Sequence, residues 1–312
     1  MTMDQLYLPI LLILVVAVIA RIPTAIRVPT ARPAWFATLI AVPAFMTRGP
    51  IIPIQTLDAW MGGENIIFLV QSWLVVFAFW GLAEAAGTDI TSSERPKLRL
   101  WIPLLSCLAF TIPFFLIPNR EGTELFFIDA HVNDLAAIIC GVLYMAAVAG
   151  ICARLLIRLH GRDAPAHWVF RIGASLVIAG CVLWSTAIIL DHTLSLGRTP
   201  IVWMYIGFDI LFYPGVVALA LGLVAFAAQR AIRQLILRRR VAALQGILTS
   251  RSFTIDENDR PLPFVAYDLM VQIEDLRILG AIRPTVEEQR TLDKVARWVE
   301  QTFPQVHDIT TS

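Results

Sequence analysis

Long uncharged apolar runs constrain this chain more than any other feature. A helix that crosses a bilayer needs about 20 predominantly apolar residues, or about 17 at the short end. Seven runs in the sequence approach or exceed this length: 5–20, 33–52, 65–84, 100–118, 134–157, 170–190 and 203–228. The sequence therefore predicts an all-α integral membrane protein whose residues 1–228 form a bundle of seven transmembrane helices.

The composition agrees with this interpretation. Apolar residues make up 57% of the chain and charged residues 16%, whereas a soluble domain is nearer half apolar and a quarter charged. The formal net charge is only +1, so bulk charge gives no reason to expect a nucleic-acid partner. The lipid bilayer is the partner that the composition predicts.

The basic residues predict how the bundle is oriented, because cytoplasmic connections of membrane proteins carry an excess of Lys and Arg. The connections predicted to lie outside hold only Arg48, Arg120 and Arg198. If run 33–52, which Pro43 interrupts, did not cross, this bias would weaken. We therefore expect an outside N-terminus, an inside C-terminus and a multi-pass location in a bacterial plasma membrane. The opposite connections and the segment after the last run hold fifteen basic residues: Arg21, Arg27, Arg32, Arg95, Lys97, Arg99, Arg154, Arg158, Arg162, Arg171, Arg230, Arg233, Arg238, Arg239 and Arg240.

Residues 229–312 are predicted to form a cytoplasmic helical tail. A basic helix over 229–248 continues the last run, and a polar linker with two prolines follows at 249–263. Thr285 and Glu288 then have the spacing of a capping box at the start of a final helix. Between the linker and this capping box, an amphipathic helix is predicted over 264–281. It is predicted to place these apolar residues on one face: Val265, Leu269, Ile273, Leu276 and Leu279.

Two amphipathic helices are too small to bury a core by themselves. We therefore expect the basic helix, a second copy of the chain or a cytoplasmic protein to cover 264–303. Leu269, Ile273 and Leu276 are the predicted partner-binding residues. The cluster Arg238, Arg239 and Arg240 is a candidate contact for anionic lipid, with a plain topological anchor as the alternative.

Asp209 is the clearest candidate for chemistry in the membrane, since an ionisable residue inside a span suggests a function. It lies about 9 Å below the predicted outer edge, at 1.5 Å per residue, and Tyr213 is one turn deeper. With His192 and Arg198 on the same side, these residues are predicted to form an outward-facing pocket for a ligand or ion. The alternative is that Asp209 is a structural group that ties two helices together.

Other polar and small residues have structural interpretations. Glu84 is expected to form a salt bridge at the cytoplasmic end with Arg95, Arg99, Arg154 or Arg171. Close contacts between helices are predicted at small residues, which let helix backbones approach in lipid. These small residues are Gly173, Ala174 and Gly180 in run 170–190, and Gly215, Ala218 and Gly222 in run 203–228.

Several activities are disfavoured by the motifs that the sequence lacks. It has no HExxH zinc-protease motif and no GxxxxGK[ST] phosphate-binding loop. Asp129, His131 and His192 are candidate metal ligands, but their spacing does not require a metal. We therefore predict no enzymatic activity, no catalytic residues, no metal site and no cofactor.

The tail carries a resemblance to a known family. Residues 267–276 read Tyr-Asp-Leu-Met-Val-Gln-Ile-Glu-Asp-Leu. They resemble a segment, Tyr-Arg-x-Val-Ile-Glu-Ile-Arg-Asp, of an uncharacterised actinobacterial family of seven-span membrane proteins. Tyr267, Ile273 and Asp275 agree, whereas Asp268 and Glu274 replace basic residues. The resemblance implies the seven-span layout and the C-terminal helical domain, and members of this family are often labelled as transporters.

Two functions follow from these expectations. The first is a sensor or scaffold that relays an external or membrane cue to a cytoplasmic partner through the C-terminal helices. The alternative is a small-solute transporter or channel, which Asp209, Glu84 and the prolines inside the runs support. The sequence shows no repeated halves of the kind found in many transporters, and we therefore favour the sensor.

Overall fold

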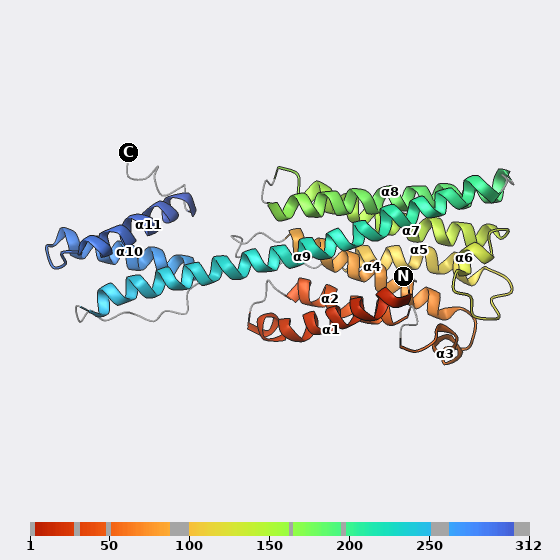
Figure 1. Cartoon of the computed structure of the whole chain (residues 1–312), viewed down its shortest axis with the longest axis horizontal. Helices are drawn as coiled ribbons and strands as arrows, with labels where there is room; N and C mark the ends of the chain where they lie inside the picture. The colour runs from red at the N-terminus through yellow and green to blue at the C-terminus, as the bar shows by residue number, and fades with distance from the viewer. Residues whose placement is uncertain are drawn as a thin grey trace. The chain divides into compact units, whose positions relative to one another are not determined.

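The computed structural model describes residues 4–27, 32–47, 51–87, 100–161, 165–194, 198–250 and 262–302. Within these ranges all regular structure is helical (Figure 1), so the all-α prediction is confirmed. The helices are α1 (Asp4–Arg27), α2 (Arg32–Met46), α3 (Ile54–Ala59), α4 (Ile66–Gly87), α5 (Trp101–Phe115), α6 (Phe127–Ala130), α7 (Leu135–Arg158), α8 (Pro165–Leu194), α9 (Arg198–Thr249), α10 (Leu262–Ile278) and α11 (Val286–Thr302).

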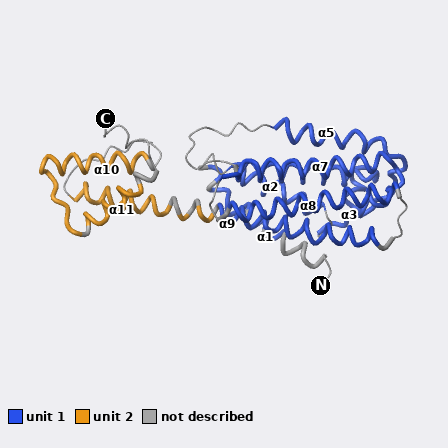
Figure 2. The backbone as a smooth tube through the Cα atoms, turned by 90° about the horizontal axis from the view of Figure 1, so that it is seen from above, with its two compact units in different colours: residues 1–226 blue, residues 227–312 orange. Residues whose placement is uncertain are grey.

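The chain divides into two compact units, residues 1–226 and residues 227–312 (Figure 2). The boundary falls inside α9, so this helix contributes to both units. We refer to the two units as the bundle and the tail.

Among the described residues of the bundle, four helices are long and apolar enough to cross a membrane. The segments are Ile66–Ala86, Leu135–Arg158, His167–Thr193 and Pro200–Phe226. They correspond to the runs 65–84, 134–157, 170–190 and 203–228. The structure is therefore compatible with a multi-pass membrane protein.

The other three runs form shorter or less regular apolar helices. The helix α2 ends at Met46, six residues before the predicted end of its run, and has Pro43 inside it. Similarly, α5 ends at Phe115 and contains Pro113. Proline removes a helical hydrogen bond, and 15 residues extend only about 22 Å. In α1 the apolar segment is Leu14–Pro23, which includes Arg21. The crossing of these three helices stays a prediction.

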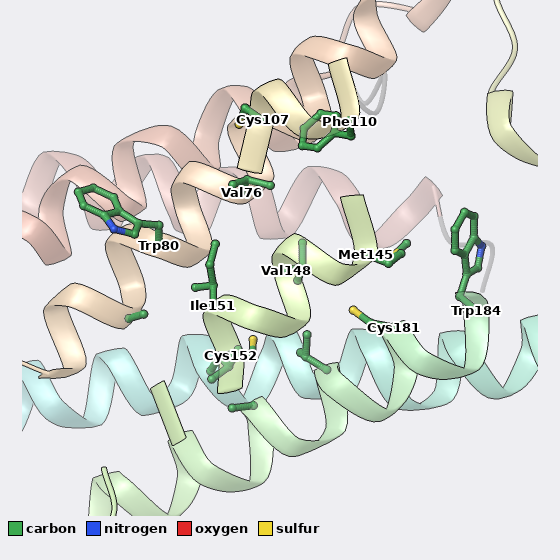
Figure 3. Close-up of a cluster of buried hydrophobic side chains, with 14 of the residues drawn as sticks. Val76, Trp80, Cys107, Phe110, Met145, Val148, Ile151, Cys152, Cys181 and Trp184 are labelled. Atoms are coloured by element: carbon green, nitrogen blue, oxygen red, sulfur yellow. The ribbon is translucent and has the colours of Figure 1, made fainter. Parts of the chain in front are cut away.

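The core of the bundle is built around α7. Figure 3 shows Val148 and Cys152 of α7 between Trp80 of α4 and Cys181 of α8. All four side chains are buried, and the two cysteines are free thiols. Because the bilayer supplies no hydrophobic drive between helices, this dense packing is what holds them together.

Small residues bring α8 and α9 into backbone contact. A Cβ atom added at Gly173 would lie 2.9 Å from the carbonyl oxygen of Gly215, and one added at Gly180 would lie 3.2 Å from the backbone nitrogen of Phe212. An added Cβ at Gly222 would meet the ring of Phe170 at 3.0 Å. The predicted close contacts at these four glycines are confirmed.

The tail has its own core. Leu244 and Leu248 of α9 pack with Ala266 and Ile273 of α10 and with Val295 of α11. The basic helix predicted over 229–248 is thus the element that covers the amphipathic hairpin.

The ends of the tail helices follow local capping rules. The backbone N–H of Thr285 donates to Glu288 Oε2 at 2.7 Å, and the N–H of Glu288 donates to Thr285 Oγ1 at 3.3 Å, so the predicted capping box is confirmed. The helix α10 stops at Ile278, because Gly280 adopts a φ of +73° and the N–H of Ala281 returns to the carbonyl of Leu276. Leu279 therefore lies beyond the helix and is 77% exposed, which corrects its predicted place on the apolar face.

Candidate functional site

Contacts between helix termini define two ends of the bundle. At one end Nδ1 of His192, near the end of α8, lies 3.0 Å from the carbonyl oxygen of Val132, just before α7. At the other end Arg154, in the last turns of α7, pairs with Glu84 of α4, and Arg171 of α8 donates to the carbonyl of Leu159. We call the first the acidic end and the second the basic end, after the residues described below.

At the acidic end, the buried carboxylate of Asp58 joins two loops. Asp58 is fully buried, and its Oδ2 accepts hydrogen bonds from the backbone N–H of Asn65 at 2.9 Å and from Thr123 Oγ1 at 2.8 Å. Its Oδ1 accepts from the N–H of Ile67 at 3.0 Å. Asp58 thereby caps the start of α4 and holds the loop after α5.

Asn65, just before α4, makes further hydrogen bonds to the loop that follows α5. Its side-chain amide donates to the carbonyls of Arg120 and Gly122 at 3.0 and 2.6 Å, and its Oδ1 accepts from the N–H of Glu124 at 2.9 Å. The backbone of Asn65 has a φ of +57°, which asparagine tolerates better than most residues. We call Asp58, Asn65 and Thr123 the loop clasp.

A group of carboxylates lies at the same end. Asp129 of α6 accepts a hydrogen bond from the hydroxyl of Tyr205 of α9, and it also interacts electrostatically with Asp191 of α8 and Asp209 of α9. The pKa of Asp129 is raised to about 6, chiefly by burial; the two neighbouring carboxylates contribute to this increase, while the Tyr205 hydrogen bond opposes it. We call Asp129, Asp191, Asp209 and Tyr205 the carboxylate cluster.

The predicted pocket is only partly reproduced by this arrangement. Asp209 belongs to the carboxylate cluster, whereas Tyr213 packs its ring 5.8 Å from that of Phe212 on the same helix. His192 contacts the loop before α7. Arg198 begins α9, and its side chain is outside the part of the chain that the structure describes.

Tyr205 and Asp191 were not singled out from the sequence, and Asp129 was named only as a candidate metal ligand. A signal for Tyr205 was present, because it lies four residues before Asp209 and therefore on the same face of a helix. Its pairing with α6 depends on the tertiary structure and left no mark in the spacing. Among the described residues, no three His, Cys, Asp or Glu side chains are grouped in a way that could hold a metal ion.

At the basic end, Glu84 is held between two arginines of α7. Its Oε1 lies 3.0 Å from Nη2 of Arg154, and its Oε2 lies 3.0 Å from Nη1 of Arg158. Arg154 was one of the expected partners, whereas Arg171 instead places its guanidinium 5.1 Å from the ring centre of Trp168. The other two expected partners, Arg95 and Arg99, lie outside the described residues. We call Glu84, Arg154 and Arg158 the basic-end triad.

In the tail, the predicted partner-binding residues have internal contacts. Leu269 and Ile273 are buried in the tail core, and Leu276 packs against it. The structure therefore does not offer this face to a partner, because α9 and α11 cover it. Within the 264–303 segment, residues 264–302 are described and Phe303 is not.

The predicted lipid-contacting arginines differ from one another. Arg238 and Arg239 are exposed, whereas the guanidinium of Arg240 lies 5.5 Å from the ring centre of Trp298 in α11. Arg240 thus has a structural contact within the tail. Contact of these arginines with lipid stays a prediction.

The tail exposes other apolar side chains at the turn between α10 and α11. Ile278 is 77% exposed and Val286 is 74% exposed, next to Leu279. A groove of ≈ 460 Å³ between α9 and α11 has a mixed lining of Ala243, Ile247, Glu288, Arg290, Thr291 and Lys294. These surfaces are exposed, whereas Leu269 is buried.

Comparison of the chain with models of protein families, with curated proteins and with solved structures finds no match. The resemblance to the actinobacterial family therefore stays a prediction.

Proposed function

We propose that the protein is a membrane sensor that relays a change at the acidic end to the tail through α9. One observation carries this proposal: α9 is a continuous helix of 52 residues. Near its start it bears Tyr205 and Asp209 of the carboxylate cluster, and near its end it bears Leu244 and Leu248 of the tail core. A single element thus connects a cluster of ionisable groups with a separate packed unit.

The proposal includes seven spans, with the acidic end outside and the basic end in the cytoplasm of a bacterial cell. Contacts at both ends of α4 support a crossing by α5. The loop clasp ties the start of α4 to the loop that follows α5, and the chain after the end of α4 leads into α5. Gly87, at the end of α4, therefore lies at the basic end, and Asn119, after α5, lies at the acidic end.

The charges at the two ends support the proposed orientation. The basic end carries Arg154, Arg158 and Arg171 against Glu84. The basic end is proposed to face the cytoplasm, because positively charged ends of membrane proteins are retained there. The acidic end holds an excess of carboxylates over Arg120 and Arg198: Asp58, Glu64, Glu121, Glu124, Asp129, Asp134 and Asp191.

A labelled full-length protein in liposomes tests the relay. The four native cysteines are replaced, and a single cysteine at Val271, an exposed position on α10, carries a spin label. Acidification of the acidic end from pH 7.5 to 5.5 serves as the cue, because the pKa of Asp129 is raised to about 6. We expect a change in label mobility that Tyr205→Phe abolishes.

A helix-breaking insertion of Gly-Gly-Pro after Ala228 is the second arm of this test. It interrupts α9 between the two units and leaves the residues of both cores in place. We expect it to abolish the response of the tail while the protein keeps its thermal stability. An unchanged response in this variant would contradict a relay through α9.

A small-solute transporter is the second candidate, and Glu84 is the observation that favours it. This carboxylate is 5% exposed and lies within a candidate membrane-spanning segment. Ionisable groups in such segments often mark transport pathways. Flux of protons or solute into the same liposomes, lost in Glu84→Gln and kept in the α9 insertion variant, would favour transport over the relay.

A further inference from the structure

The basic-end triad carries one more positive than negative charge. Glu84 is shared between Arg154 and Arg158, with both N–O distances at 3.0 Å. The Glu84 side chain is 6% exposed, while those of Arg154 and Arg158 are 25% and 32% exposed. The carboxylate is therefore enclosed, and the two guanidinium groups form the outer surface of the triad.

The triad lies at the end of two candidate spans. Glu84 is two residues from the end of the segment Ile66–Ala86, and Arg158 is the last residue of the segment Leu135–Arg158. At 1.5 Å per residue, Arg154 is about 6 Å inside that end. This depth corresponds to the border between hydrocarbon and headgroups, where an excess charge is poorly solvated on one side.

Around Arg158, donors exceed acceptors among the described residues. A guanidinium has five N–H groups in a planar fork, and Arg158 gives only Nη1 to Glu84. Among the described residues, Nε and Nη2 of Arg158 have no ion-pair or hydrogen-bond partner. One turn before Glu84 on α4, Trp80 is 1% exposed and its Nε1 has no hydrogen-bond partner among the described groups.

A third helix adds a group suited to the same depth. Trp168 of α8 is 55% exposed and lies next to the guanidinium of Arg171, which is bonded to the carbonyl of Leu159 just after α7. Exposed tryptophans concentrate at the level of the headgroups. The basic end therefore has the features of a membrane interface on α4, α7 and α8.

We propose that the basic-end triad binds the phosphate of an anionic phospholipid, with Arg158 as the main contact. A phosphate oxygen accepts from the outer nitrogens of the guanidinium in the two-pronged geometry that arginine favours. The bound phosphate neutralises the excess charge of the triad, as in basic pockets between spans that hold lipid headgroups. Lipid is favoured over free phosphate, because the bilayer holds its phosphate groups at this depth.

Thermal unfolding of the full-length protein in mixed micelles tests the proposal. Phosphatidylglycerol is titrated against phosphatidylcholine at equal total lipid. We expect phosphatidylglycerol to raise the unfolding temperature in a saturable way. The half-saturating fraction should rise about fivefold in Arg158→Gln, the typical effect of removing one basic contact with anionic lipid.

Two matched variants control for a general loss of charge or fold. Arg120→Gln removes an arginine at the acidic end, and we expect it to leave the lipid titration unchanged. Arg158→Lys keeps the charge and the pairing with Glu84 but loses the fork, so its half-saturating fraction should lie between those of the wild type and Arg158→Gln. If Arg158→Gln is unstable in phosphatidylcholine alone, the lysine variant decides the test.

Three outcomes would overturn the proposal. The first is no saturable effect of phosphatidylglycerol. The second is an equal effect in the wild type and in Arg158→Lys. The third is that inorganic phosphate reproduces the lipid effect at millimolar concentration, which would assign the triad to a free anion and not to a lipid.

Discussion

Asp58 is the most fully bonded carboxylate described in the bundle, and its replacement should therefore be costly. In Asp58→Ala, the N–H groups of Asn65 and Ile67 and the hydroxyl of Thr123 lose their acceptor. Buried donors without a partner cost about 1–3 kcal/mol each, and water entering the site offsets part of this. We expect a loss of about 3 kcal/mol, measured by thermal or denaturant unfolding in detergent.

Glu64→Gln provides the comparison for Asp58→Ala at the same end of the bundle. Glu64 is exposed and contacts Arg120 at 3.4 Å, and exposed ion pairs contribute only about 0–1 kcal/mol. Equal losses of stability in the two variants would contradict the role assigned to the loop clasp.

Asp129 predicts how the stability of the bundle depends on pH. An aspartate titrates near 4 in an unfolded chain, whereas burial raises the pKa of Asp129 to about 6. The folded state thus holds the proton more tightly. The contribution of Asp129 to stability is fully present below about pH 4 and is lost as the pH rises through about 6.

We expect Asp129→Asn to flatten the fall in unfolding temperature between pH 4.5 and 7.0, because the amide does not ionise. Glu121→Gln, at an exposed position outside the carboxylate cluster, should keep the slope of the wild type. An unaltered slope in Asp129→Asn would show that another group governs this pH range.

At the scale of elements, the crossing of α8 and α9 depends on glycine. In Gly173→Leu, a side chain must occupy the space of the carbonyl oxygen of Gly215 and the backbone nitrogen of Leu219, both about 3 Å from the position of the added Cβ. Inserting side-chain atoms into a packed core typically costs about 1–3 kcal/mol. The loss at Gly173 should reach at least the upper part of this range, since backbone atoms do not yield as side chains do.

Gly150→Leu is the matched control, because an added Cβ at Gly150 of α7 would meet no heavy atom within 4 Å. We expect its unfolding temperature to stay within a few degrees of the wild type. A loss as large as that of Gly173→Leu would mean that leucine is poorly tolerated in these helices for a reason other than packing.

The capping box of α11 should stabilise the tail and not the bundle. Thr285→Ala removes the hydroxyl that accepts from the N–H of Glu288, and the loss of an N-cap typically costs about 1 kcal/mol. We expect faster hydrogen exchange in α11 and α10, with unchanged exchange in α4 and α7. Slower or unchanged exchange in α11 would contradict this assignment.

The sequence predicted those features that depend on neighbouring residues. The apolar runs of α4, α7, α8 and α9, the glycines of the α8–α9 crossing and the Thr285–Glu288 box all follow from composition and short spacing. The loop clasp did not, because Asp58 and Thr123 are 65 positions apart and neither stands out in its own loop. Likewise, an amphipathic face such as that of Leu269 gives no indication of which element covers it.

At the scale of the whole molecule, the charge difference between the two ends predicts the orientation in the membrane. Glu121 at the acidic end and His160 at the basic end are exposed. Each is replaced in turn by a single cysteine. The four native cysteines are replaced in both variants. In intact cells, an impermeant maleimide should label the cysteine at position 121. The cysteine at 160 should react only after the membrane is permeabilised, and the reverse pattern would invert the proposed topology.

The loop clasp also sets an order for the maturation of the chain. Ribosomes add about 5–20 residues per second, so about 3–13 s separate the synthesis of Asp58 from that of Thr123. During that interval the carboxylate of Asp58 lacks the hydroxyl of Thr123 as a hydrogen-bond donor, and the side-chain amide of Asn65 lacks the carbonyls of Arg120 and Gly122 as acceptors. The N-terminal junction of α4 is thus completed only after α5 and the loop that follows it have been synthesised. A chain arrested before residue 120 therefore leaves the buried polar groups of Asp58 and Asn65 without these partners.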